Sequence, residues 1–166
     1  MKRRVAFLGM VLALALILAY VETFLPLPIA VPGIKLGLAN CVILFVLYLT
    51  GIKEAALISI TRVFLTGFLF GNMAGILYSL SGAFLSLIAM AFAKKQNGLS
   101  VIGVSILGGV THNIGQMIMA VLVTETIAVL YYVPVLLIAG MTTGIINGIL
   151  AKTILKNKNI IIEGWK

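Results

Sequence analysis

The sequence has no aspartate, one cysteine and one histidine among its 166 residues. A single cysteine excludes an intrachain disulfide, and a lone histidine without a nearby carboxylate or thiolate falls short of the usual three or four metal ligands. The P-loop, nucleophile-elbow and zinc-helix motifs are also missing. We therefore expect no catalytic residue, no metal site and no cofactor.

Charged residues make up only 10% of the chain, whereas 62% is hydrophobic and the mean hydropathy is +1.23. A soluble domain has roughly 45–50% apolar residues, so this composition indicates a membrane protein. A spanning helix needs about 20 apolar residues, which leaves room for about five to seven spans and no separate extramembrane domain.

The apolar segments predict an all-α, polytopic membrane protein that forms a single transmembrane domain over residues 1–166. Polar and glycine-containing breaks divide it into six expected transmembrane helices. Their approximate ranges are 5–21, 36–50, 55–70, 73–93, 99–123 and 134–151. The basic start resembles a secretory signal, but no small-residue cleavage pattern follows, so we interpret the first segment as a retained helix.

Basic residues gather at one side of this expected topology. With the N-terminus in the cytoplasm, the outer side has only Lys35, and the inner side collects Lys2, Arg3, Arg4, Lys53, Lys94, Lys95, Lys152, Lys156, Lys158 and Lys166. Such an excess is typical of cytoplasmic loops, and an even number of spans places both termini in the cytoplasm. Because the charges lie at the ends of apolar runs, we expect a lipid bilayer and no nucleic acid as partner.

Small and polar residues repeat at helical spacing and so share one face of several segments. Such faces usually point into a helix bundle. They comprise Ser59, Arg62 and Thr66; Gly75, Ser79, Gly82 and Ser86; Ser105, Gly109, His112 and Gln116; and Gly140, Gly144, Asn147 and Ala151. The glycines four residues apart predict close internal helix packing.

Arg62 lies near the middle of its expected span, where a charge costs at least about 2.5–3.5 kcal/mol. The four glutamates lie at helix ends or in tails, so the sequence offers no acid inside the membrane to pair with it. Arg62 either binds the carboxylate or phosphate of a substrate, or is satisfied by carbonyl groups or by extending towards the interface.

His112, Asn113 and Gln116 form a second polar cluster, interpreted either as part of a pocket or as interhelical hydrogen-bond donors. Asn40 lies one turn into the second helix, and Lys35 precedes that helix on the outer side. Lys35 either meets an anionic ligand or anchors the helix end at the interface, where Glu22 is available to pair with it.

Several blocks resemble a known family. They are Pro-Gly-Ile-Lys-Leu-Gly-Leu-Ala-Asn at 32–40, Arg62, Tyr-Ser-Leu-Ser-Gly at 78–82, the stretch 108–116 with His-Asn-Ile-Gly-Gln, and Tyr-Val-Pro at 132–134. They are similar to the bacterial Gx transporter family, also labelled heptaprenyl diphosphate synthase component I. The resemblance extends over nearly the whole chain and implies the cell membrane of a bacterium.

The transporter label implies a substrate-binding S component of an energy-coupling factor importer, which lacks an ATPase of its own. Its partners would be a small, anionic or polar metabolite, a transmembrane coupling subunit and a pair of ATPases. In S components an Ala-x-x-x-Ala motif docks the coupling subunit, and Ala15 and Ala19 match it as an outward-facing seam on the first helix. The expected substrate-binding residues are Arg62, His112, Asn113, Gln116, Asn40 and Lys35.

The synthase label implies an alternative function in isoprenoid or quinone biosynthesis. Prenyl chain elongation needs Mg²⁺ held on the diphosphate, usually by clustered aspartates, and this chain has none. The chain would therefore be a non-catalytic membrane accessory subunit of a prenyltransferase. Its apolar grooves would hold a prenyl tail, while Arg62 or Lys35 met the diphosphate.

Overall fold

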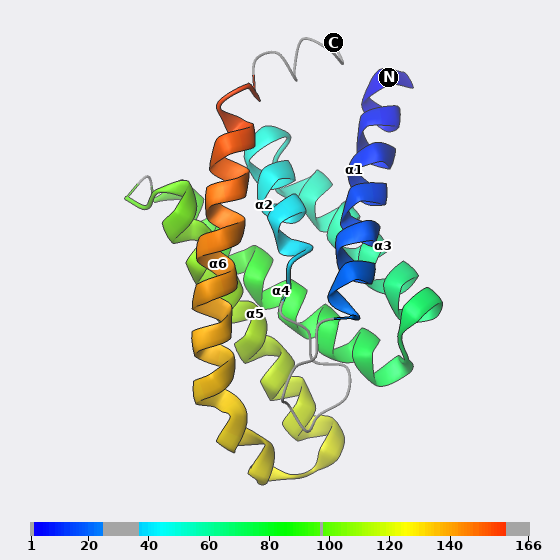
Figure 1. The fold of residues 1–166 in the computed structure, drawn as a ribbon, viewed down its shortest axis with the longest axis vertical. Helices are drawn as coiled ribbons and strands as arrows, with labels where there is room; N and C mark the ends of the chain where they lie inside the picture. Colours follow the sequence, from blue (N-terminus) through cyan, green and yellow to red (C-terminus); the bar gives the residue numbers. More distant parts are fainter. Residues whose placement is uncertain (1, 25–36, 97, 159–166) are drawn as a thin grey trace.

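The computed structural model describes residues 2–24, 37–96 and 98–158, and these residues form helices without any strand (Figure 1). The elements are α1 (Lys2–Glu22), α2 (Asn40–Leu49), α3 (Ile52–Phe70), α4 (Met73–Lys95), α5 (Val101–Thr124), the 3₁₀ helix η1 (Ile127–Tyr132) and α6 (Val133–Leu155). The predicted all-α class is confirmed.

The helices differ in whether they can cross a membrane. Among the described residues, four helical stretches are long and apolar enough: Arg3–Glu22, Met73–Lys95, Val101–Thr124 and Ile127–Leu155. Helix α2 has only 10 residues, because it begins at Asn40 and not near residue 36 as predicted. Its length of about 15 Å is half of a hydrocarbon core of about 30 Å. Six complete spans therefore stay a prediction.

Local sequence explains several helix boundaries. The side chains of Asn72 and Ser100 accept hydrogen bonds from the N–H groups of the third residues of α4 and α5, at 2.7 and 3.2 Å. These are typical N-caps, which satisfy backbone donors that lack an intrahelical acceptor. Gly51 has a positive φ of 116°, and this conformation allows the tight connection between α2 and α3.

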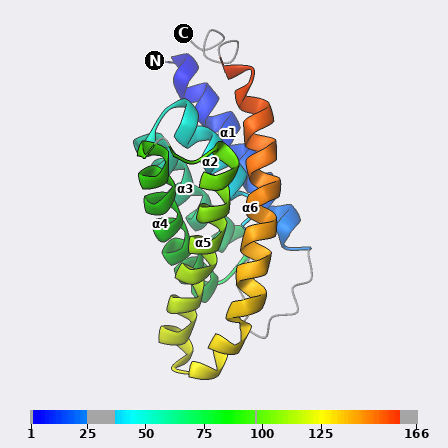
Figure 2. The same cartoon turned by 90° about the vertical axis from the view of Figure 1, so that its left-hand side faces the viewer.

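Helices α4, α5 and α6 form one closely packed layer, with α5 between the other two (Figure 2). Glycine makes the close approach possible. A Cβ atom on Gly115 would lie 2.7 Å from the Ser81 carbonyl oxygen of α4, and one on Gly144 would lie 2.6 Å from Ile106 Cα of α5. The predicted internal packing of the glycine faces is confirmed for these helices.

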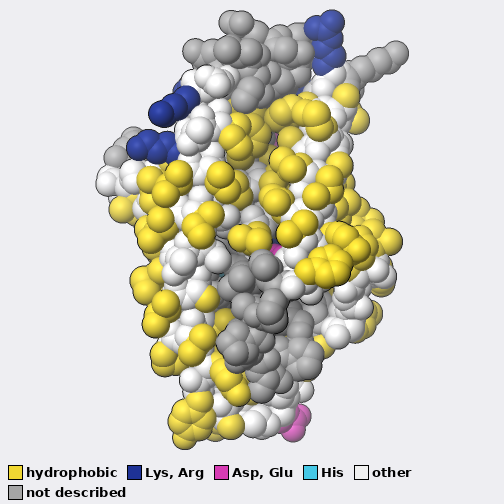
Figure 3. All heavy atoms as spheres, in the orientation of Figure 1, with side chains coloured by type: hydrophobic (Ala, Val, Ile, Leu, Met, Phe, Trp, Pro, Cys, Tyr) yellow, Lys and Arg dark blue, Asp and Glu magenta, His cyan; other side chains and the backbone are white. Residues whose placement is uncertain are grey.

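Helix α2 lies inside the bundle, where Ile43, Leu44, Val46 and Leu47 are buried in the main hydrophobic cluster. Large apolar side chains cover the outside of the bundle, as the face in Figure 3 shows. Basic side chains gather at the end where α1 starts and α6 finishes (Figures 1 and 3). This distribution suits a protein surrounded by lipid.

The glycine contacts predict a difference between two Gly→Ala substitutions. Gly144→Ala should destabilise the fold by about 1–3 kcal/mol, since the new methyl group meets the backbone of α5. Gly9→Ala should not destabilise the fold, because none of the described residues lies within 4 Å of a Cβ there and alanine has the higher helix propensity. Cys41 is buried and is the sole cysteine, so a thiol-reactive dye reports thermal unfolding in detergent. Equal unfolding midpoints for the two variants would contradict the packing.

Candidate functional site

A small polar cavity lies where the end of α1, the start of α2 and the middle of α3, α4 and α5 meet. It has a volume of about 10 Å³, which is room for about one water molecule. Its lining combines charged and neutral polar groups with small apolar ones: Ala19, Glu22, Gly37, Arg62, Val63, Thr66, Ser79 and His112.

Two opposite charges face this cavity. Arg62 of α3 is 6% exposed and Glu22, the last residue of α1, is 5% exposed. The Glu22 carboxylate interacts electrostatically with the Arg62 guanidinium. The expectation that no acid lies within reach of Arg62 is therefore wrong. Helix α1 ends near mid-height of the bundle, well short of the η1 end, and so carries Glu22 inside (Figure 1).

Gly37 connects this charge pair to the neighbouring helices. Its N–H donates to Glu22 Oε1, and its carbonyl oxygen accepts from Asn147 Nδ2 of α6 at 3.2 Å. Its φ of +86° favours glycine, and a Cβ there would lie 2.8 Å from Asn40 Nδ2 and 3.4 Å from His112 Cδ2. Gly37 thus allows Asn40 and His112 to lie beside the cavity.

His112 and Gln116 are paired one helical turn apart on α5, with 3.0 Å between their Nε2 atoms. Both side chains are buried, as the polar face of this segment predicted. Gly82 gives α5 the space it needs, since a Cβ there would lie 2.8 Å from the His112 carbonyl oxygen. The His112 side chain also lines the polar cavity, together with Arg62.

Several buried polar atoms of the site have no hydrogen-bond partner within residues 2–24, 37–96 and 98–158: Asn40 Nδ2, Arg62 Nε and His112 Nδ1. A buried polar group without a partner costs about 1–3 kcal/mol, and more if it is charged. These atoms come from three different helices. Arg62 and His112 line the polar cavity, and Asn40 and His112 both lie close to Gly37, which lines it too. Their arrangement is suited to a ligand that accepts hydrogen bonds.

Two of the predicted site residues are not part of this cluster as described. Asn113 donates from Nδ2 to the Leu136 carbonyl oxygen at 2.6 Å, and it lines a separate apolar pocket of about 140 Å³ between α5, η1 and α6. Lys35 lies outside the described residues, as does its predicted pairing with Glu22.

The expected outward seam on α1 also needs correction. Ala15 is 0% exposed and packs in the main core, and Ala19 is 3% exposed and lines the polar cavity. Small residues suit close packing inside a bundle as well as between subunits, so their spacing did not distinguish the two. The exposed small residues of α1 are Ala6, Gly9 and Ala13. Docking of a partner on Ala15 and Ala19 stays a prediction.

Glu22 is the main site residue that sequence reasoning missed. The one feature of the sequence that could have singled it out is the rarity of acids, since Glu22 is one of four in a chain with net charge +8.

Within the described ranges, no group of three or more His, Cys, Asp or Glu side chains lies close enough to hold a metal ion. The chemistry available here is charge pairing and hydrogen bonding.

A family model described as heptaprenyl diphosphate synthase component I matches residues 11–154. The chain belongs to this family. The match confirms the family label expected from the sequence blocks, and it includes Glu22, Arg62, His112 and Gln116. No curated protein and no solved structure matches the chain. The family's description names a component of a synthase and assigns no role to individual residues.

The opposite charges of Arg62 and Glu22 predict that the losses of stability in their single variants do not add up in the double variant. Arg62→Gln and Glu22→Gln should each cost at least about 1–3 kcal/mol, because each leaves a buried charge without its nearby counter-charge. The double variant should lose clearly less than the sum, since it removes both charges. Arg4→Gln is the control, because Arg4 is 53% exposed where it pairs with Glu54, and it should cost at most about 1 kcal/mol. Thermal unfolding of the four variants measures this, and strictly additive losses would refute the coupling.

Proposed function

We propose that this protein is a non-catalytic, membrane-embedded substrate-binding subunit, which binds a small anionic metabolite at Arg62 and serves an importer of the energy-coupling factor type. The observation that carries the proposal is the buried Arg62, whose Nε has no hydrogen-bond partner among the described residues, on a cavity that the buried His112 also lines. A guanidinium in such a setting is suited to a carboxylate or phosphate, because it offers several donors in a planar fork.

The roles of the site residues follow from their chemistry. Arg62 holds the negative group of the ligand, and His112 and Asn40 supply further hydrogen bonds. Gln116 positions the His112 ring through their contact at 3.0 Å. Lys35 is expected at the outer mouth of the pocket, where a cation attracts anionic ligands.

Binding requires a rearrangement, because a cavity of about 10 Å³ does not hold a metabolite. The Glu22 carboxylate lies beside Arg62 in this arrangement and is the group that a ligand anion replaces. Exchange of one carboxylate for another keeps the Arg62 charge compensated throughout, which avoids an unpaired buried charge. The ligand-free state therefore has its own internal anion.

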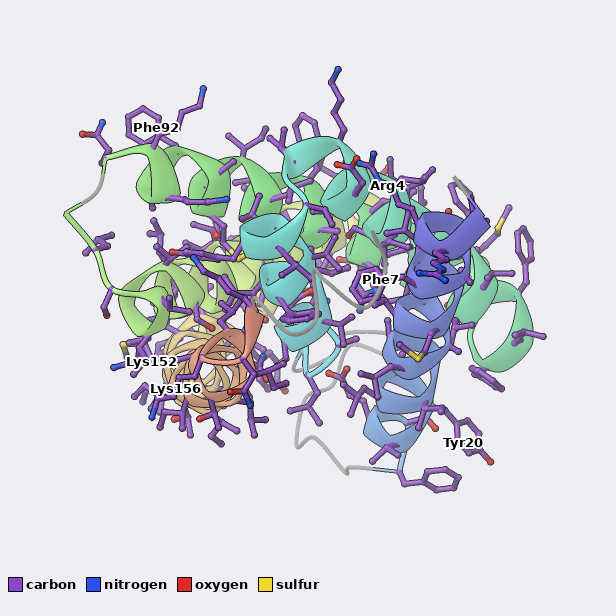
Figure 4. All side chains as sticks on the ribbon, turned by 90° about the horizontal axis from the view of Figure 1, so that it is seen from above. Arg4, Phe7, Tyr20, Phe92, Lys152 and Lys156 are labelled. Atoms are coloured by element: carbon purple, nitrogen blue, oxygen red, sulfur yellow. The ribbon has the colours of Figure 1, made fainter. Side chains whose placement is uncertain are left out.

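Transport would depend on other subunits. The sequence has no P-loop, so ATP hydrolysis by that route must come from paired ATPases, joined through a transmembrane coupling subunit. We place the basic end, where α1 starts and α6 finishes, on the cytoplasmic side of the cell membrane. Figure 4 views the bundle from this end, with Arg4 on α1, Lys152 on α6 and Lys156 at the C-cap of α6. The ATPases would approach from here.

The family description favours a second candidate, a membrane accessory component of a prenyl diphosphate synthase. In this case Arg62 would meet the diphosphate, and the apolar pocket beside Asn113 would hold part of the prenyl chain. The sequence contains no aspartate, so a partner subunit would have to hold the Mg²⁺ for chain elongation.

Chemical rescue tests whether the Arg62 site accepts an external carboxylate. Glu22→Ala removes the Cγ methylene and the carboxylate of the side chain, which together have four heavy atoms. Acetate has the same number of heavy atoms and the same charge, so it can fill the space that they leave. The variant should lose roughly 3 kcal/mol, on the order of 6–12 °C in unfolding midpoint, and acetate should restore much of this loss. Chloride at the same ionic strength should not.

Two controls belong to this rescue. Glu22→Gln leaves no space for acetate, so its midpoint should not respond. Adding Arg62→Gln to Glu22→Ala should abolish the rescue, because the cation that binds acetate is gone. If acetate and chloride act alike on Glu22→Ala, Arg62 does not form an anion site.

Copurification separates the two candidate functions. The tagged protein, extracted in mild detergent from its own cells, should retain a transmembrane coupling subunit and paired ATPases. Recovery of a soluble, aspartate-rich prenyl diphosphate synthase subunit instead would reject the importer and support the second candidate. An unrelated tagged membrane protein from the same cells provides the background.

A further inference from the structure

A further hollow lies at the basic end of the bundle (Figure 3), away from the polar cavity and from the apolar pocket beside Asn113. It has a volume of about 430 Å³ and is formed where α2 ends, α3 begins and α4 ends. Its lining is mainly apolar, with two lysines: Leu47, Ile52, Ile88, Ala91, Phe92, Lys94 and Lys95. We name it the α3–α4 groove. Phe92 projects outward at the edge of the bundle in Figure 4.

The walls of the α3–α4 groove leave large apolar side chains uncovered. Ile52 is 50% exposed, Ile88 is 51% exposed and Phe92 is 63% exposed. These side chains come from two different helices and flank one hollow, so they form a concave surface that suits a hydrocarbon chain. Burial of such surface is favourable by roughly 25 cal/mol per Å².

The two lysines give the groove its charge, and one of them is fixed in place. Lys94 Nζ donates to the Leu47 carbonyl oxygen at 2.7 Å and lies 5.0 Å from the centre of the Tyr48 ring. Lys95 is exposed beside it. Glu54, in the first turn of α3, is already paired with Arg4. Among the described residues, no acidic side chain pairs with Lys94 or Lys95, so their charges can attract an external anion.

We propose that the α3–α4 groove binds an anionic phospholipid. The phosphate meets Lys95 and the free donors of Lys94, while an acyl chain lies against Ile52, Ile88 and Phe92. A helix bundle with basic pockets at the cytoplasmic interface is suited to anionic headgroups. The largely apolar lining favours a lipid over free phosphate, which would gain nothing from these walls. This inference does not depend on what binds at Arg62.

Native mass spectrometry of the full chain with added lipid tests the proposal. The wild-type protein should retain phosphatidylglycerol at least fivefold more than phosphatidylcholine of the same acyl chains. Lys95→Gln should reduce phosphatidylglycerol retention about fivefold, and Lys94→Gln with Lys95→Gln by more than tenfold, since each lysine near a membrane surface contributes about fivefold. Phosphatidylcholine retention should change little.

A matched control removes two charges from the same end of the bundle. Lys152→Gln with Lys156→Gln changes the net charge equally, and these lysines lie in the last turn and at the C-cap of α6, away from the groove (Figure 4). This variant should retain phosphatidylglycerol as the wild type does. Equal loss in both double variants, or equal retention of the two lipids by the wild type, would overturn the proposal. The Cys41 dye assay verifies that each variant is folded.

Discussion

The burial of the Arg62 guanidinium is the constraint on which the centre of this structure depends. A charge in an apolar bundle needs compensation, and the chain has only four acids with which to provide it. Glu22 supplies the opposite charge because α1 stops at mid-height of the bundle. Gly37, with its positive φ, then donates its N–H to the same carboxylate. The end of α1 and the start of α2 are thereby tied to the polar centre of α3.

The site lies between two differently packed parts of the fold. On one side, glycine contacts hold α4, α5 and α6 close together, so the backbone that carries His112 and Gln116 has little freedom to shift. On the other, α1, α2 and α3 bring Glu22, Asn40 and Arg62 through side-chain packing. A ligand bound at Arg62, as proposed, would meet the closely packed helix α5 on one side and the end of α1 on the other. Replacement of Glu22 by a ligand anion fits this division.

Sequence reasoning predicted the helices and the inward glycine faces, because hydrophobic runs and four-residue glycine spacing determine them locally. The buried pairing of His112 with Gln116 follows equally from their spacing on one face. The depth of Glu22 could not be predicted, since it depends on where α1 ends relative to its neighbours. Ala15 and Ala19 likewise suit an inner or an outer face, and only tertiary packing placed them inside. Asn113, about 100° round the helix from His112, contacts α6 instead of the cavity.

The proposed ligand of Arg62 is a small anion. The most direct test is native mass spectrometry of the protein purified from its own cells, with identification of the small molecule that it releases. We predict a water-soluble carboxylate or phosphate that is bound by the wild type, lost in Arg62→Gln and retained in Arg4→Gln. An identical bound molecule in all three proteins, or a neutral ligand that Arg62→Gln still binds, would contradict the account.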